Sequence, residues 1–285
     1  MSPELRKKNR QKRKIIDGFI YGLMVVSTLA IVAALLAIIA YILVNGIGGV
    51  NLGFVFGHGE HSILPMIVTT FFVVVVSMLI ALPVGIITAV FLTEYSTNSK
   101  ALRFIRLAIE TLAGIPSILY GLFGLLAFSR LFGFGQSISA GGFTLSIMVL
   151  PVIIRTNEES LKTIPQEMRE GSLALGTTQW QTIYRVVLPS AFPGIITACI
   201  LSIGRIVGEA APVLLTVGIA KNLPTSIFQS GRTLTIHLYY LTKEALRPED
   251  FQTAFATATI LVIFVIIVNA TTRLTTSAFH KRMGQ

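Results

Sequence analysis

Apolar residues gather in six long runs along this chain, separated by shorter polar or glycine-rich stretches. A helix needs roughly 20 residues, at about 1.5 Å of rise each, to cross the hydrocarbon core of a bilayer. Every run reaches that length, and the pattern therefore predicts six transmembrane helices. They are expected at residues 18–44, 66–93, 107–128, 137–156, 192–217 and 253–272. Four prolines inside these runs are expected to kink their helices: Pro83, Pro116, Pro151 and Pro212.

The composition excludes a soluble protein. Of the 285 residues, 53% are hydrophobic and 13% are charged, and the mean hydropathy is +0.76. A soluble domain of this size needs more polar surface to cover itself, whereas a chain solvated by lipid can expose its apolar side chains. We therefore expect an all-α integral membrane protein with six transmembrane helices.

Positive charge is concentrated at the N-terminus. The formal net charge is +10, and seven Lys or Arg residues stand in the run RKKNRQKRK at positions 6–14. A basic run directly before a membrane segment fits the positive-inside rule, so we expect membrane lipid and no nucleic acid as its neighbour. The apolar run that follows is longer than the roughly 7 to 15 residues of a cleaved signal peptide, which indicates a retained anchor.

The loops set the expected orientation. Residues 45–65 contain no Lys or Arg, whereas basic residues recur through 155–185 and in the tail. Cytoplasmic loops carry the excess of Lys and Arg, so both termini are expected in the cytoplasm. The predicted layout is a basic cytoplasmic segment at 1–14, a membrane domain at 15–273 and a cytoplasmic tail at 274–285.

The connection at residues 157–189 is too long and too patterned for a simple link between two spans. Thr163 with Gln166, and Pro165 in the first turn, predict the start of a helix. Gly176 is placed to end this helix, because glycine accepts the left-handed backbone conformation without steric cost.

A second short helix is predicted after that glycine. Thr178 and Gln181 have the spacing of a capping box, and Leu188 followed by Pro189 is expected to stop the helix. One face is expected to carry Trp180, Ile183 and Val187. Such a helix pair fits either a groove on a partner protein or the lipid headgroups, and the pattern alone leaves both open.

The predicted fifth span contains an arginine and a glutamate. Arg205 falls near the middle of the run, where a lone arginine costs about 2.5 to 3.5 kcal/mol and must face protein or water. Glu209 is four residues further on, hence on the same helical face. The pair is either a buried brace of little net stability or an oxyanion contact in a translocation cavity, since a guanidinium matches the oxygens of phosphate or sulfate.

Other candidate chemistry is sparse. His58 and His61 lie on a glycine-rich loop with Glu60 as the nearby acid, which favours a solvated loop over a metal site, so no metal is expected. The sequence has no Gly-Lys pair and thus no phosphate-binding loop of its own, so any ATP must be bound by a partner.

Several motifs carry a resemblance to a known family. Glu170, Gly176, Leu188 and Pro189 have the spacing of the E-A-A-x-x-x-G and I-x-L-P elements in permease subunits of ATP-binding-cassette importers, which the chain resembles. It departs from that pattern at three positions with small or conservative changes: Gly171, Ser172 and Val186.

Longer stretches extend the resemblance over most of the chain. IPSILYGLFGLLAF at 115–128, LALGTTQWQTIYRVVLPSAFPGI at 173–195 and IGRIVGEAAPVLLTVG at 203–218 look closely like the type I permeases of phosphate importers. EAAPVLLT at 209–216 and FLTEYS at 91–96 favour the PstA subunits of that family over the PstC subunits.

The resemblance implies a multi-pass permease subunit that imports inorganic phosphate across the cytoplasmic membrane of a prokaryote, not an enzyme. It implies a sister permease (PstC), two copies of an ATPase (PstB) and an external phosphate-binding protein (PstS). No cofactor is expected in this chain, because ATP and Mg would be bound by the ATPase. The resemblance assigns Glu170 and Gly176, in the coupling loop at about 157–189, to the ATPase contact. Arg205 and Glu209 are expected in the translocation path.

Three rival functions remain open at this point. The first is a permease for another oxyanion such as sulfate, molybdate or phosphonate. The second is a gradient-driven carrier that uses Arg205 and Glu209 as a proton relay. The third is a membrane scaffold without transport. A phosphate that retains a proton can give it to Glu209, whereas sulfate has no such proton, and this favours phosphate.

Overall fold

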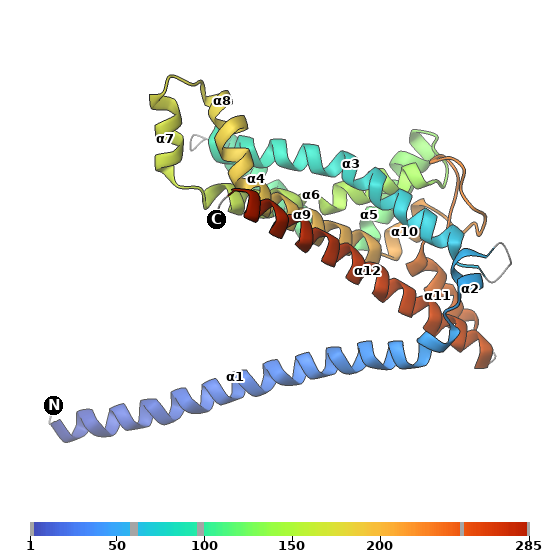
Figure 1. Cartoon of the computed structure of the whole chain (residues 1–285), viewed down its shortest axis with the longest axis horizontal. Helices are drawn as coiled ribbons and strands as arrows, with labels where there is room; N and C mark the ends of the chain where they lie inside the picture. The colour runs from blue at the N-terminus through green and yellow to red at the C-terminus, as the bar shows by residue number, and fades with distance from the viewer. Residues whose placement is uncertain (1–2, 58–61, 96–99, 246–247, 284–285) are drawn as a thin grey trace.

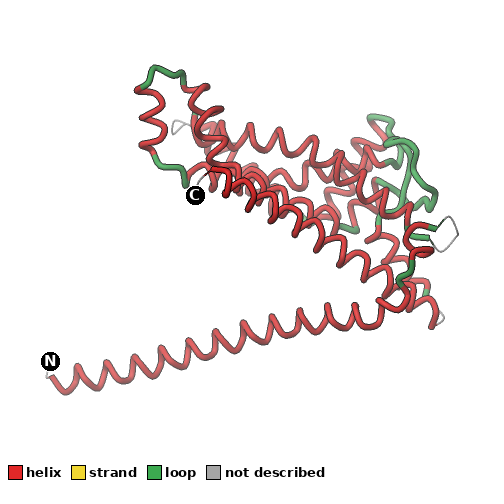
Figure 2. Tube along the Cα trace, viewed as in Figure 1, coloured by secondary structure: helices red, strands yellow, loops and turns green. Residues whose placement is uncertain are grey.

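The computed structural model describes residues 3–57, 62–95, 100–245 and 248–283, and all regular structure within them is helical (Figure 2). The longer helices are α1 (Pro3–Gly46), α3 (Leu64–Glu94), α4 (Lys100–Gly114), α6 (Ile138–Lys162), α9 (Leu188–Gly208), α11 (Leu234–Glu244) and α12 (Pro248–Met283). The shorter ones are η1 (Ile47–Gly49), α2 (Leu52–Phe56), α5 (Ser117–Gly124), η2 (Leu125–Leu131), α7 (Gln166–Ala174), α8 (Gln179–Thr182), η3 (Ile183–Val187) and α10 (Ala211–Thr216).

Five helical segments are long and apolar enough to cross a membrane, and a bent pair makes a sixth candidate. The five segments are Ile16–Gly49, Leu64–Glu94, Ile138–Lys162, Gln179–Gly208 and Asp250–Thr271. The prediction of an all-α membrane protein is therefore confirmed, with changes in the third and fifth spans.

The core of the bundle is the contact between α3 and α6. Val73 and Ala81 of α3 and Leu145 and Ile153 of α6 are almost fully buried in one hydrophobic cluster. The helices approach so closely that a side chain at Gly85 would collide with Ile153. Two helices packed without room between them tend to move together, because a packed interior deforms little.

Helix α9 packs against α6 in the opposite direction. The hydroxyl of Ser160 donates to the carbonyl of Ala191 at 3.4 Å, and a Cβ on Gly194 would collide with that serine. This contact sets the register of α9 along α6.

Helix α1 diverges from the rest of the bundle (Figure 1). It touches α12 only near its C-terminal end, where Tyr41 lies edge-to-face with Phe255 and Thr259 donates to the carbonyl of Ile42 at 3.2 Å. Figure 1 shows the start of α1, the end of α12 and the α7–α8 region at one end of the molecule, which agrees with both termini on one side of the membrane.

The kink expected at Pro116 is present, and it is sharp enough to divide the third predicted span into two helices. The chain bends by 101° between Leu102–Gly114 and Ser117–Leu131. Pro116 stands at the bend as the N-cap of α5, and a proline disfavours helical backbone in the residue before it. The Tyr120 hydroxyl donates to the Leu112 carbonyl at 2.6 Å and closes the bend.

Helix α4, on the cytoplasmic side of this bend, is held to α6 by ion pairs. Arg106 and Lys162 both contact Glu158, whose side chain is 9% exposed, with Lys162 at 2.7 Å. Glu110 pairs with Arg155 at 3.3 Å, which supports a structural role for Glu110.

The fifth predicted span, 192–217, is also corrected. α9 ends at Gly208, Glu209 has extended backbone (ψ 131°), and Pro212 lies in the first turn of the separate helix α10. Pro212 has no N–H for a continuing helix, which accounts for the break just before it. By contrast, Pro83 and Pro151 remain inside single helices.

Candidate functional site

The coupling loop forms a helical hairpin built from α7 and α8. Gly176 ends the first arm with a φ of +83°, as its position predicts. The Thr178 hydroxyl accepts from the Gln181 N–H and the Gln181 side chain accepts from the Thr178 N–H, so the predicted capping box is confirmed. Glu170 and Gly176 are both exposed on this hairpin, which leaves them free to contact another protein.

Ser172 joins the two arms of the hairpin. Its hydroxyl lies 2.9 Å from the Thr177 hydroxyl and 3.0 Å from that of Thr182, and Thr177 also donates to the Ser172 carbonyl at 2.8 Å. Ser172 thus makes polar contacts inside the turn.

The start of α7 differs from the prediction. The N-cap of α7 is Pro165, without a side-chain bond, and the helix begins at Gln166. Thr163 instead caps the end of α6, where its hydroxyl donates to the Ser160 carbonyl at 2.8 Å. The hydroxyl satisfies a carbonyl at the end of the preceding helix, and no side-chain bond caps the start of α7.

The second arm also differs. Pro189 does not stop it, because the π-helical stretch η3 carries the chain into α9, making one continuous span Gln179–Gly208. Proline has no backbone N–H to donate, and the wider i→i+5 hydrogen bonding of a π-helix lets the chain continue past this missing bond. Ile183 and Val187 are buried, but Trp180 is 63% exposed and so lies off their face.

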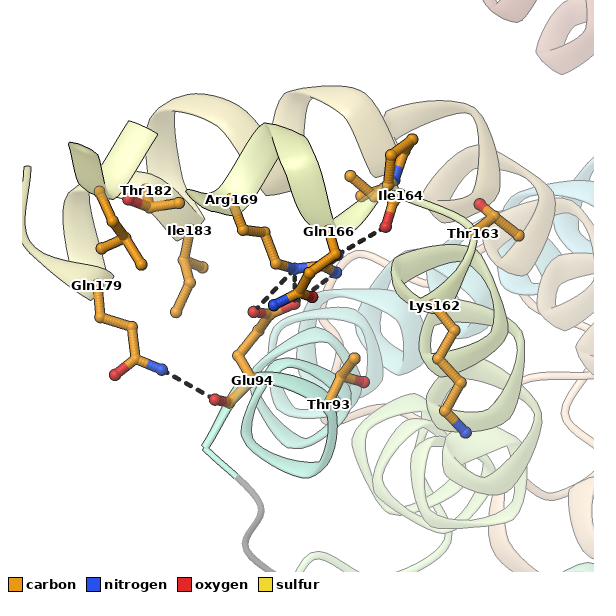
Figure 3. A pocket seen from close by; sticks show the side chains of 12 residues that line it. Thr93, Glu94, Lys162, Thr163, Ile164, Gln166, Arg169, Gln179, Thr182 and Ile183 are labelled. Carbon is orange, nitrogen blue, oxygen red and sulfur yellow. Dashed lines mark hydrogen bonds and ion pairs between the residues drawn. The ribbon is translucent and has the colours of Figure 1, made fainter. Parts of the chain in front are cut away.

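Arg169 is the centre of the contacts between the hairpin and the membrane helices (Figure 3). Its Nε donates to both carboxylate oxygens of Glu94, at 3.2 and 3.3 Å, and its Nη2 donates to Glu94 Oε1 at 2.9 Å. The same guanidinium donates to the carbonyls of Ile164 at 2.6 Å and Leu161 at 2.9 Å. Gln179 on the second arm donates to the Glu94 backbone carbonyl at 2.8 Å.

These contacts lie beside a hollow of about 750 Å³ between α3 and the hairpin. Figure 3 shows Glu94 pointing toward Arg169 from the end of α3. Sequence reasoning missed both residues, although Arg169 directly precedes Glu170 and Glu94 lies in the stretch FLTEYS. A charged residue ending a long apolar run was the available signal.

Arg205 and Glu209 do lie together, but not on one helical face. Arg205 is in the last turn of α9 and Glu209 is in the extended link that follows. Arg205 Nε is 3.8 Å from Glu209 Oε1, and the side chains are 37% and 17% exposed. This is an ion pair too long for a hydrogen bond. Within the described residues no hydrogen bond of the Arg205 side chain is found.

The depth of Arg205 follows from the packing of α9 on α6. Fourteen residues separate Ala191 from Arg205, about 21 Å at 1.5 Å each. Counting fourteen residues back from Ser160 reaches Ser146, inside the apolar part of α6. Arg205 is therefore about level with the middle of an apolar stretch, as the sequence predicts, although it is near the end of its own helix.

The segment between α10 and α11 buries a second cation. Arg232 is 8% exposed, donates from Nε to the Ile219 carbonyl at 3.1 Å and lies over the Tyr240 ring. Burial, with Arg232 and Lys221 nearby, lowers the pKa of His237 to about 4. His237 is on α11, which is not among the candidate spans.

No group of three potential metal ligands occurs among the residues that the structure describes. His58 and His61, the pair weighed as a metal site, lie outside those residues.

Comparison with known proteins gives concordant matches. The model of the family described as "Binding-protein-dependent transport system inner membrane component" matches residues 81–285. The Probable ABC transporter permease protein YqgI of Bacillus subtilis (strain 168) is 33% identical over 289 residues, covering 95% of this chain and 98% of that protein.

Two further matches bear on substrate and fold. Phosphate transport system permease protein PstA 1 of Mycobacterium tuberculosis (strain ATCC 25618 / H37Rv) is 39% identical over 196 residues, covering 68% of this chain and 63% of that protein. A chain in the crystal structure of a bacterial alginate ABC transporter, in complex with an alginate-bound periplasmic protein, aligns with a TM-score of 0.68 at 13% identity, covering 94% of this chain and 96% of that chain. The last match shows the fold alone.

Proposed function

The chain belongs to the family of binding-protein-dependent transport system inner membrane components, and from that premise we propose that it carries inorganic phosphate into the cell. As a member it is a multi-span permease of the prokaryotic inner membrane that works with an ATPase and a substrate-binding protein, and it is not itself an enzyme. The phosphate assignment is supported by relatives that are named as phosphate permeases, at up to 39% identity.

Arg205 is the observation that carries the substrate proposal. Its guanidinium has one loose ion pair, at 3.8 Å, and it lies level with apolar helix surface where an unpaired charge is costly. Phosphate oxygens can accept hydrogen bonds from the N–H groups of this guanidinium, because the geometries of the two groups match in two parallel hydrogen bonds.

Glu209 completes the proposed contact. It holds the Arg205 side chain from the extended link and accepts a hydrogen bond from the P–OH group of a phosphate that retains a proton. A fully deprotonated oxyanion offers no such proton and instead meets the carboxylate as a like charge, so the pair discriminates against it.

We further propose the partners of the phosphate system. These are a sister permease like PstC, two copies of an ATPase like PstB and an external phosphate-binding protein like PstS. ATP and Mg would be bound by the ATPase, because the sequence has no phosphate-binding loop. Glu170 and Gly176, exposed on the hairpin, would contact that ATPase.

The test is uptake of radiolabelled phosphate in cells that lack their own high-affinity system and express this chain with its three partners. We expect import that requires the ATPase and resists excess unlabelled sulfate. Competition by sulfate would reassign the substrate to another oxyanion. Import that survives loss of the ATPase but collapses with a protonophore would indicate a gradient-driven carrier.

A further inference from the structure

Arg169 bonds both its own neighbourhood, the link from α6 into α7, and the end of α3, which is 75 positions away in the sequence. Its guanidinium on α7 bonds the last residue of α3, Glu94, the carbonyl of Leu161 in the last turn of α6, and the carbonyl of Ile164 in the link that follows α6. We propose that Arg169 is the positioning residue that makes the coupling hairpin and the α3–α6 pair move as one body. This inference rests on the proposed function, because it concerns how ATP hydrolysis by the partner reaches the transport path.

Electrostatics explain why an arginine is needed at this place. α3 and α6 both end here, and the C-terminal end of a helix carries partial negative charge. Glu94 adds a full negative charge to the end of α3, where the helix disfavours it. A cation placed between both helix ends and the carboxylate offsets all three, and Lys162 cannot replace it because it pairs with Glu158 at 2.7 Å.

Geometry makes the contact stiff. The Glu94 and Arg169 side chains are only 9% and 14% exposed, and the guanidinium fork engages both carboxylate oxygens. A planar fork held at several points resists rotation, whereas a lysine at the same place would hold a point charge. When α7 is displaced, Glu94 therefore moves with it.

The second arm of the hairpin reaches the same residue. Gln179 donates to the Glu94 carbonyl at 2.8 Å, so both arms are bonded to the last residue of α3. From Glu94 the displacement passes into the tightly packed α3–α6 core, where Gly85 lies directly against Ile153. Motion of the hairpin, which lies outside the membrane, is thus transmitted to the helices α3 and α6 beside the transport path.

The experiment compares phosphate import with ATP hydrolysis in proteoliposomes that contain the complete transporter, with wild type, Arg169→Met, Glu94→Gln and the double variant. For each single variant we expect import per ATP hydrolysed to fall about tenfold, while hydrolysis stays within about twofold of wild type. The double variant is expected to be no worse than either single one, because the two side chains act as one unit. Matched controls are Arg103→Met and Glu159→Gln, exposed residues outside the contact.

Arg169→Lys keeps the charge and guards against loss of assembly in the other variants. We expect it to assemble and to lower import per ATP by about threefold, since it loses the fork. An unchanged ratio in Arg169→Lys, or ratios in the single variants equal to wild type, would overturn the proposal. Absence of phosphate import by wild type would instead refute the proposed substrate, so the two failures are distinguishable.

Discussion

The two arginine–glutamate pairs of this protein differ in almost every physical respect. Arg169 and Glu94 join separate helices through short hydrogen bonds, with side chains 14% and 9% exposed. Arg205 and Glu209 are four residues apart, 3.8 Å from each other and 37% and 17% exposed. The same two residue types thus form a hydrogen-bonded contact between helices in one place and a loose ion pair in the other. We call Arg169–Glu94 the closed pair and Arg205–Glu209 the open pair.

The difference follows from what surrounds each arginine. Arg169 lies beside the Glu94 carboxylate and two carbonyls at and just after the end of α6, so most of its donors are bonded. Arg205 stands beside a single helix end, followed by a link that places Glu209 slightly too far away. An arginine with most of its donors bonded can hold two helices together, whereas an arginine with unbonded donors can bind and release a ligand.

Removing the closed pair should have the largest effect on stability. Arg169→Met leaves Glu94 mostly buried without a cation, and breaking a buried pair in this way costs about 3 kcal/mol. We expect a lower melting temperature of the purified complex and faster hydrogen exchange in α7. A melting temperature equal to that of the Arg103→Met control would show that the joint contributes nothing to stability.

Removing the open pair should reduce transport instead. Arg205→Gln deletes the proposed charged contact to phosphate, and we expect phosphate import to fall about 100-fold with unchanged thermal stability. Arg205→Lys, which keeps the charge, should retain more activity than Arg205→Gln. Import equal to wild type in Arg205→Gln would make the residue a brace and place the substrate site elsewhere.

Acidification should separate the two ends of the molecule. The folded-state pKa of His237, about 4, lies below the ordinary value of 6.5, so the unfolded state binds more protons and stability falls as pH drops from 6.5 toward 4. The loss is about 2 kcal/mol at pH 5 and is absent above pH 7.

This loss should be local to the outer end. Thr235, on the same helix as His237, donates to the carbonyl of Val207 beside Arg205. Hydrogen exchange at pH 7 and pH 5 should therefore show faster exchange in α11, with α7 little changed, and Gln at position 237 should remove the difference. Equal acid sensitivity at both ends would contradict the assignment to His237.

The smallest effect is expected at the turn of the hairpin. Gly176→Ala forces a side chain into left-handed backbone, at about 1 kcal/mol, with no atom nearby to collide with the added methyl group. We expect faster exchange in residues 174–178 and little change at Arg169 or Arg205. Loss of the whole hairpin would show that this turn, more than Arg169, holds the coupling loop in place.

Local signals predicted the parts of the fold that depend on neighbouring residues. The span lengths, the left-handed turn at Gly176 and the capping box of Thr178 were all readable, because each depends on a few adjacent side chains. The bend at Pro116 and the break before Pro212 both occur at prolines. A proline in the sequence indicates that a helix is interrupted, but not by how much. At Pro83 and Pro151 the same residue type leaves one continuous helix.

By itself, the sequence determined that this is an all-helical membrane protein with a patterned cytoplasmic hairpin and an arginine in the middle of an apolar run, because hydrophobic length, charge placement and turn residues act locally. Only the tertiary structure decided that Arg169 meets Glu94 across 75 positions of the chain, and that Arg205, among the residues described, has a single ion pair at 3.8 Å. Which charges meet depends on where helix ends converge, and that convergence is set by packing between segments that no local pattern connects.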